Sequence, residues 1–501
     1  MAYGAHFHRG DLHIHSFGDG GSYDVNDDQM TPANIVAKAI EKNLSNISIT
    51  DHNKIKNSIE AVNISVEKKL LVIPGIEVST TQGHLLVYFP TNQDLENFYG
   101  KLVFDPSKKF CTQGIHDCLE YALKYNGIGI LAHIEVDSGF EMTIGKFNEI
   151  FDQAFQHPAI LALEIKNHDS INYYTEFDGL ADRKTAMKKR NTKLGYPENY
   201  KLAKIMSSDA HSMNAFGKNA AGADRLTRFK MDELSFESLR IALFSHDSRV
   251  RLEDDIPLAI PKFKEFKATG GILDGMHVEF RNNMNCIIGG RGTGKSTLIT
   301  AIQEASSNPV ISTNIQKSNV WPTKIELKYE NEAGQEFLCI LEHGKLEFLE
   351  KIISIPFKER PELTVTRHNK SNGTAEVKDI SQLSLGQQQS IMLSILIQSD
   401  SCLPLIIDQP EDNLDSEFIF NSVVANLRKC KERRQIIVVT HNSNIGVLGD
   451  AELVIPLIAS NEKSSIADLG SIDNRKTQEQ CCEILEGGKR AFTTRKEIYR
   501  I

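Results

Sequence analysis

Asp11-Leu12-His13-Ile14-His15 is a short apolar segment that carries two histidines two residues apart. Because side chains alternate between the two faces of a strand, these two imidazoles point the same way. Further apolar runs in the first half of the chain also lead into residues that can bind a metal ion, and helical stretches separate them. These runs lie at 47–52, 71–77, 128–133, 161–164 and 205–211. The pattern predicts an α/β fold, most simply a β/α barrel with a parallel sheet, whose ligands meet at one mouth.

The bulk composition describes an ordinary water-soluble protein of more than one domain. The chain has 501 residues, 40% of them hydrophobic and 25% charged, which is too long for a single core. No apolar run approaches the roughly 18 residues that span a bilayer, and the N-terminus lacks a basic segment followed by an apolar one. The eight cysteines are scattered, which favours buried thiols in a reducing cytoplasm. The net charge of −9 gives no overall nucleic-acid footprint, although a local basic groove is compatible with it.

Changes in composition along the chain predict two domains. Residues 1–250 form the first, residues 251–262 a linker rich in Asp and Pro, and residues 263–501 the second. Within the first domain we expect a helix that is capped by Thr31 and has Pro32 in its first turn. The charge run 183–193 is interpreted as a solvated face, with a phosphate-contacting loop as the alternative.

Histidine placement points to metal chemistry in the first domain, since 12 of the 16 histidines precede residue 250. Taken with their spacing, the motifs Thr50-Asp51-His52, Gly75-Ile76-Glu77, Gly83-His84, Ala132-His133 and Asp209-Ala210-His211 resemble those of the polymerase and histidinol phosphatase (PHP) superfamily. Members of that superfamily have a distorted β/α barrel and bind up to three divalent metals, usually Mn²⁺, Zn²⁺ or Fe²⁺, to hydrolyse phosphoesters. Carried over motif by motif, the resemblance assigns the metal ligands to His13, His15, His52, Glu77, His84, His133, Asp209 and His211.

One more ligand normally follows the His-x-His motif of that superfamily. Asp19 and Asp24 are both near, and Ser22-Tyr23-Asp24 favours Asp24. Asp51 is expected to take part in catalysis by orienting His52 or a neighbouring ligand as an acceptor behind the metal site. Glu164 is interpreted as a structural residue at a strand end, with a place at the mouth of the barrel as the alternative.

The second domain opens with a complete phosphate-binding loop. Residues 289–296 match Gly-x4-Gly-Lys-Ser, follow an apolar strand and precede a helical stretch, which is the context this motif requires. Backbone N–H groups would surround the phosphates of ATP, with Lys295 on the β and γ oxygens and Ser296 on Mg²⁺. The expected nucleotide-binding residues of the loop are Gly289, Gly290, Gly292, Gly294, Lys295, Ser296 and Thr297.

Three later motifs, in matching order, resemble those of ABC and SMC-type ATPases. Residues 403–408 form an apolar run that ends on Asp408, suited to hold Mg²⁺; Ser384, Gly386 and Gln387 lie in a signature-like motif; and His441 resembles the switch histidine. In that class the signature of one protomer completes the ATP site of another, so the resemblance implies a homodimer or larger assembly. The class usually has a glutamate directly after the strand-end aspartate, but here that position is Gln409. Glu411 is the expected substitute for polarising water.

A PHP domain followed by such an ATPase resembles the TrlF-like PHP–ATPase proteins of bacteria. The resemblance implies an ATP-regulated metal-dependent nuclease with DNA favoured over RNA as partner, and, by analogy of architecture alone, a role in antiphage defence. Two alternatives stay open: a phosphatase for a small molecule or nucleotide, and a non-catalytic DNA repair clamp whose barrel has lost its metals.

Overall fold

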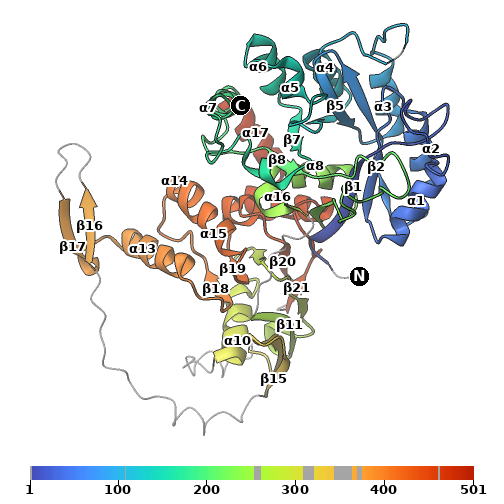
Figure 1. Ribbon diagram of the computed structural model, residues 1–501. Coiled ribbons are helices and arrows are strands. Elements are labelled where there is room, and N and C mark those ends of the chain that lie inside the picture. Colours follow the sequence, from blue (N-terminus) through green and yellow to red (C-terminus); the bar gives the residue numbers. More distant parts are fainter. Residues whose placement is uncertain are drawn as a thin grey trace. The chain divides into compact units, whose positions relative to one another are not determined.

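The computed structural model describes residues 3–107, 109–252, 261–307, 321–342, 364–368, 375–460 and 463–500. The chain divides into two compact units, one of His6–Ile256 and one of Met1–Ala5 together with Pro257–Ile501. In Figure 1 the first unit runs from blue to green and the second from yellow to red. Most of the expected linker, residues 253–260, lies outside the described residues.

The first unit contains two five-stranded sheets. One has the order β10-β9-β1-β2-β3, with β1 (His6–Ile14), β2 (Asn46–Ile49), β3 (Leu71–Val72), β9 (Thr227–Met231) and β10 (Val250–Leu252). The other has the order β4-β5-β6-β7-β8, with β4 (Gly75–Thr80), β5 (Gly83–Tyr88), β6 (Ile128–Leu131), β7 (Ile160–Glu164) and β8 (Ala203–Ile205). Parallel pairs join β1 to β2, β2 to β3, β6 to β7 and β7 to β8, so their carboxyl ends lie at one edge of each sheet.

The expectation of a parallel sheet is wrong for part of this unit. The strand β5 is antiparallel to both β4 and β6, and β9 is antiparallel to both β1 and β10. Only residues 81 and 82 separate β4 from β5, which is far too short for the crossover that a parallel pair needs. Isolated bridges between His52 and Glu77 and between Ile14 and Ala210 connect the two sheets, although the ladders among the described residues do not form one closed ring.

Helices fill the connections of the first unit as expected. They include α1 (Pro32–Glu41), α2 (Lys56–Ser65), α3 (Asn92–Tyr99), α4 (Ile115–Lys124), α5 (Phe140–Ile144), α6 (Glu149–Phe155), α7 (Ala181–Leu194), α8 (Phe236–Phe244) and α9 (His246–Arg249). The Thr31 side chain caps α1 by accepting from Asn34 N, which confirms the predicted start of that helix. The charge run lies on α7 rather than on a loop. There Arg183 pairs with Glu141, and Arg190 is buried against three backbone carbonyls.

In the second unit the phosphate-loop strand is at the centre of a sheet of order β18-β19-β13-β20-β21. These strands are β13 (Met284–Gly289), β18 (Leu405–Asp408), β19 (Ile436–Val439), β20 (Leu453–Ser460) and β21 (Lys463–Ile466). A smaller antiparallel sheet, β12-β11-β14-β15, contains β11 (Lys262–Thr269), β12 (His277–Glu279), β14 (Lys324–Glu330) and β15 (Glu336–Glu342).

The helices that matter for the second unit are α10 (Lys295–Ser307), α13 (Leu385–Gln398), α14 (Ser416–Phe418), α15 (Ala425–Cys430), α16 (Arg475–Glu486) and α17 (Lys489–Tyr499). A separate hairpin pairs β16 (Thr364–His368) with β17 (Ala375–Asp379). In the part of the chain that the structure describes, none of the helices combines the length and the apolar character that crossing a bilayer requires.

Candidate metal centre and nucleotide site

Glu77, on β4, is the hub of a histidine cluster at the carboxyl ends of the first unit's strands. Its carboxylate is completely buried, and five imidazoles surround it. The nitrogen-to-oxygen distances to Glu77 are 3.2 Å for His13, 3.3 Å for His15, 3.0 Å for His52, 2.8 Å for His84 and 3.3 Å for His133. One carboxylate thus bridges two groups of imidazoles, because Oε2 faces His13, His15 and His52 while Oε1 faces His84 and His133.

The inner part of the cluster has the dimensions of a metal-ligand shell. The Nε2 atoms of His13 and His15 are 3.1 Å apart, and each also approaches Asp209 Oδ1, at 3.5 and 3.1 Å. A tetrahedron with metal–ligand bonds of about 2.0–2.1 Å has edges of about 3.3–3.4 Å. The donor spacings around His13, His15, Glu77 and Asp209 therefore fit a divalent metal ion.

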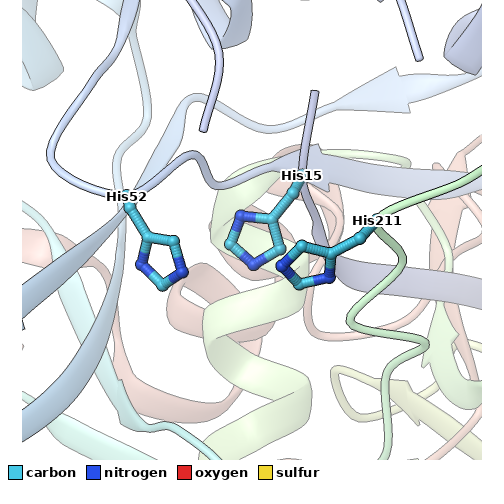
Figure 2. A group of neighbouring side chains, drawn as sticks. All are labelled: His15, His52 and His211. Atoms are coloured by element: carbon cyan, nitrogen blue, oxygen red, sulfur yellow. The ribbon is translucent and has the colours of Figure 1, made fainter. Parts of the chain in front are cut away.

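A second, outer group of donors faces the solvent side of the centre. Asp24 Oδ2 is 3.0 Å from His211 Nε2 and 3.5 Å from His52 Nε2. Figure 2 shows the rings of His15, His52 and His211 converging on a shared space, and donor atoms of these three residues lie within 4.8 Å of one another. Asp24 and Asp209 line an open depression together with His211, so the outer group can be reached by substrate. Asp19, the other candidate ligand, is exposed.

The charges of the cluster compensate one another. Burial lowers the pKa of His13, but the carboxylates of Glu164, Glu77 and Asp209 outweigh it and hold that pKa well above its ordinary value. Burial alone would raise the pKa of Glu77, yet the nearby imidazoles of His52, His13 and His84 keep it well below its ordinary value. His15 differs, because burial dominates and lowers its pKa to about 4. A neutral His15 is the form that can donate a lone pair to a metal.

Asp51 contacts this centre through Ser22. All the hydrogen bonds of its buried carboxylate come from the backbone and hydroxyl groups of Ser16 and Ser22. Ser22 Oγ in turn lies 2.7 Å from His15 Nδ1 and accepts from His52 N. When the hydroxyl donates to Asp51, His15 Nδ1–H donates to the hydroxyl and Nε2 keeps its lone pair. Asp51 was expected to hydrogen-bond a histidine directly, but it reaches His15 through the Ser22 hydroxyl. None of the contacts described for the Asp51 carboxylate supports a direct catalytic role.

Glu164 is the functional residue that sequence reasoning underrated. At the end of β7, its carboxylate lies 2.9 and 3.1 Å from His13 Nδ1 and accepts from His133 N. A hydrogen bond at Nδ1 fixes the tautomer of His13 so that Nε2 can face a metal. The available signal was its place at the end of an apolar run, the same place as the predicted ligands.

Backbone strain marks two of the predicted ligands, His133 and Asp209. His133 and Asp209 have φ values of 26° and 52°, in the left-handed region that residues other than glycine rarely adopt. Asp209 is held there because its N–H donates to His13 O and its carboxylate pairs with Lys166 Nζ at 2.8 Å. Such strained positions cluster at functional sites, which agrees with the convergence of donors here.

The phosphate loop of the second unit has its expected form between β13 and α10. Gly292 and Gly294 have φ values of 79° and 86°, which a side chain would strain. Lys295 Nζ donates to the carbonyls of Gly289 and Gly290, both at 2.8 Å, and burial lowers the pKa of this amine. Gly289 ends β13, Gly290, Gly292 and Gly294 lie in the connecting loop, and Lys295, Ser296 and Thr297 form the first turn of α10.

Asp408, at the end of β18, faces this loop. Burial raises its pKa, and the Ser296 hydroxyl and Lys295 partly oppose the rise. Asp408 and Ser296 are therefore neighbours, as a shared Mg²⁺ requires. The next residue, Gln409, has a φ of 48° and donates its N–H to Val439 O.

Glu411 is joined to His441 rather than to the phosphate loop. Its side chain is buried, and its Oε1 accepts from Thr440 Oγ and His441 N, both at 2.7 Å, and lies 3.0 Å from His441 Nδ1. The imidazole itself is 56% exposed, although its backbone is anchored by Glu411. Glu411 and His441 thus form one hydrogen-bonded unit.

The signature-like residues lie at the start of α13. Ser384 caps the helix and forms a capping box with Gln387. A Cβ at Gly386 would clash with the carbonyl oxygen of Asn413, so this glycine allows a close backbone approach. The structure therefore places Gly386 against the backbone of Asn413, while Ser384 and Gln387 hydrogen-bond each other at the start of the helix.

Comparison with known proteins agrees with the metal-binding half. Residues 11–177 match the model of the PHP domain family. Uncharacterized protein MJ1587 of Methanocaldococcus jannaschii is 32% identical over 91 residues, which cover 17% of this chain and 53% of that protein. The chain thus spans about half the length of this curated relative.

Solved structures resemble each half of the chain at low identity. A complex of Endonuclease Q with a 27-mer duplex carrying an abasic lesion is 18% identical and covers 48% of this chain and 57% of that chain, with a TM-score of 0.36. The SMC head domain from Thermotoga maritima is 15% identical and covers 41% of this chain and 98% of that chain, with a TM-score of 0.26. Residues 11–177 thus match the PHP domain family, and residues 289–296 of the same chain match the Gly-x4-Gly-Lys-Ser phosphate loop.

Proposed function

We propose that this protein is an ATP-regulated metal-dependent nuclease. The observation that carries the proposal is the buried Glu77 carboxylate with five imidazoles around it and Asp209 beside it. A PHP domain with this donor set supports a metal-dependent hydrolase. The bound metals, with Mn²⁺, Zn²⁺ and Fe²⁺ as candidates, would lower the pKa of a water molecule and offset the charge of an anionic phosphodiester.

The chain's own residues would divide the work between binding and orientation. His13, His15, His52, His84, His133 and His211, with Glu77, Asp24 and Asp209, would hold two or three metal ions. Glu164 and Ser22 would keep His13 and His15 in the tautomers that can ligate. Lys166, which pairs with Asp209, would present a positive charge to the substrate's phosphate. The retained contacts of all these donors argue against a barrel that has lost its metals.

The second unit would supply the control by ATP. Lys295 and Ser296 would bind the phosphates and Mg²⁺ with Asp408, and Glu411 would polarise the attacking water in concert with His441. We further propose that Ser384, Gly386 and Gln387 contact the ATP of a second copy, which makes the active form a homodimer. Because Gln409 replaces the usual glutamate, we expect slow ATP hydrolysis; a Glu411→Gln variant with unchanged ATP turnover would remove Glu411 as the base.

Nucleic acid, with DNA favoured, is the proposed substrate because a phosphatase for a small metabolite has no need of an ATPase unit. The architecture supports antiphage defence as the biological setting, and the eight free cysteines support a cytoplasmic location.

A cleavage assay tests the proposal directly. Purified protein with Mn²⁺ is incubated with single- and double-stranded DNA and RNA, with and without ATP, beside a His13→Ala, His15→Ala double variant and a Lys295→Ala variant. We expect metal-dependent cleavage of DNA that the double variant lacks and that ATP changes only when Lys295 is present. Rapid turnover of a phosphomonoester without cleavage of any polynucleotide would instead identify a phosphatase.

A further inference from the structure

Tyr23 offers an aromatic surface at the edge of the metal centre. It precedes Asp24, and its ring centroid is 5.3 Å from that of His52, with 30° between the ring planes. Despite this contact the residue is 53% exposed. Around it the imidazoles and carboxylates of the inner cluster are almost completely buried. A large aromatic ring that stays open to solvent beside buried ligands is available for a substrate.

Lys109 places a positive charge at the same edge. Its Nζ lies 5.1 Å from the centre of the Tyr23 ring. Its backbone carbonyl accepts from the side chain of Asn53, at 2.8 Å, and Asn53 is the buried residue that follows His52. The segment that carries a predicted metal ligand thus also anchors Lys109. Its long flexible side chain can leave the ring for an anion that binds nearby.

An exposed aromatic ring and a cation side by side are the two elements that bind an unpaired nucleotide. The base stacks on the ring, and the ammonium group offsets the charge of the adjacent phosphate. A phosphomonoester without a base would use only the cation. In a duplex the faces of each base are covered by its neighbours, so stacking on a protein ring requires an unpaired base.

We propose that Tyr23 and Lys109 form a nucleotide-binding rim that selects single-stranded DNA for the metal centre. An unpaired base stacks on Tyr23, and the neighbouring phosphate pairs with Lys109 while the scissile phosphate enters the depression lined by Asp24, Asp209 and His211. This inference rests on the proposed nuclease function and narrows its substrate class.

The chain contains a matched pair for the control. Phe177 is 70% exposed, and Lys201 Nζ lies 5.3 Å from the centre of its ring. These two residues line a different cavity, together with His168 and His246. The control pair therefore has the same chemistry as the rim without its place beside Asp24.

The test measures kcat/KM for a short single-stranded oligodeoxynucleotide and for methyl p-nitrophenyl phosphate, a diester without a base. We expect Tyr23→Ala to lower the value for the oligonucleotide about tenfold or more, mainly through KM, and to lower the value for the small diester much less. Tyr23→Phe keeps the ring and should stay within about twofold of the wild type, as should Phe177→Ala. Lys109→Gln should reduce the slope of log KM against log salt concentration by about one.

Several outcomes would contradict the proposal that Tyr23 and Lys109 bind a nucleotide. They are equal losses on both substrates in Tyr23→Ala, full cleavage of the oligonucleotide by that variant, and a wild type that prefers duplex DNA or RNA. Metal content measured for each variant separates loss of the rim from loss of the centre. A wild type that hydrolyses the small diester but cleaves no nucleic acid refutes the nuclease itself, which differs from a nuclease that does not depend on Tyr23.

Discussion

The metal centre and the nucleotide site differ in how far the folded chain prepares them for their ligands. At the metal centre, donors from segments far apart in the sequence, such as His52 with Glu77 and His13 with Asp209, already lie 3.0–3.5 Å from one another. At the nucleotide site, Lys295 is turned back onto the carbonyls of its own loop. Carboxylates and imidazoles attract and hydrogen-bond one another, so they can assemble from the protein's own charges. A loop of backbone N–H groups has no such partner and takes its charge from the phosphates it binds.

The largest effect is expected when the charge of Glu77 is removed, which tests whether the metal centre depends on the protein's own charges. Glu77→Gln removes the charge that five imidazoles share, four of them buried. We expect loss of bound metal and a decrease in phosphodiester hydrolysis of about a hundredfold or more. This decrease is larger than the one expected when a residue that only hydrogen-bonds a metal ligand is replaced. Metal per chain by mass spectrometry and the hydrolysis rate measure both.

Glu265→Gln is the matched control for that variant. Glu265 belongs to a second Glu–His group, with His277 and Glu279, which lies at a partly exposed position on β11 and β12. The control should keep the metal content of the wild type. Equal metal loss in both variants would show that the Glu77 cluster is not the main metal site.

The second variant addresses the nucleotide side. Lys295→Ala removes the amine that would contact the β and γ oxygens, so ATP hydrolysis should fall about a hundredfold or more. The metal content of the PHP domain should not change, because its donors come from the other unit. Lys463→Ala, which removes a partly exposed lysine paired with Asp274, is the control for charge. Joint loss of metal and of ATP turnover would contradict the separation of the two sites.

A smaller effect is expected when a residue that hydrogen-bonds a predicted ligand, rather than the ligand itself, is replaced. Glu164→Gln keeps the size of the side chain but removes the charge that faces His13 Nδ1, and should lower hydrolysis about 10- to 100-fold. Glu135→Gln is the control, because Glu135 accepts only from the backbone of Lys166 and Asn167 in the contacts described. If the two variants lose the same activity, Glu164 is a structural residue at a strand end, as its sequence position alone suggested.

The sequence predicted the parts of the fold that depend on local patterns. Apolar runs located most strands of the first unit, and Thr31-Pro32 located the start of α1. The direction of β5 was not predictable from its own residues, because it depends on the short connection to β4 and on pairing with β6. Pairing between distant segments is set by tertiary contacts that a local pattern does not contain.

The candidate site was also predictable only as far as local sequence patterns allow. Spacing and motif placed the imidazoles, and the structure brings them together around Glu77. The roles of Glu164 and Ser22 were not predictable from the sequence. Glu164 hydrogen-bonds His13, which lies far away in the sequence, and Ser22 contacts His15 through a hydroxyl group, which is not a typical metal ligand. Asp51 was recognised as a supporting residue, but its path through Ser22 required coordinates. Ligands are visible in a sequence, whereas the hydrogen bonds that orient them are not.

The smallest predicted effect concerns a buried cation outside the cluster. Lys204, on β8, has a solvent-shielded amine with no hydrogen-bond partner among the described residues, and burial lowers its pKa to about 7. In the unfolded chain the pKa is near its ordinary value of 10.5. Between these values the unfolded state binds more protons, so this group costs stability at pH 7 and below, and the cost fades as the pH approaches 10.5.

Lys204→Met should therefore stabilise the first unit by about 1–3 kcal/mol at pH 7, and by less at pH near 10. Hydrogen exchange of the β7 and β8 amides, compared with the wild type at each pH, measures this locally. Lys189→Met, which removes an exposed lysine paired with Asp152, should show no such pH-dependent gain. If Lys204→Met destabilises the unit at pH 7, this amine has a partner, and the contrast with the fully paired imidazoles around Glu77 disappears.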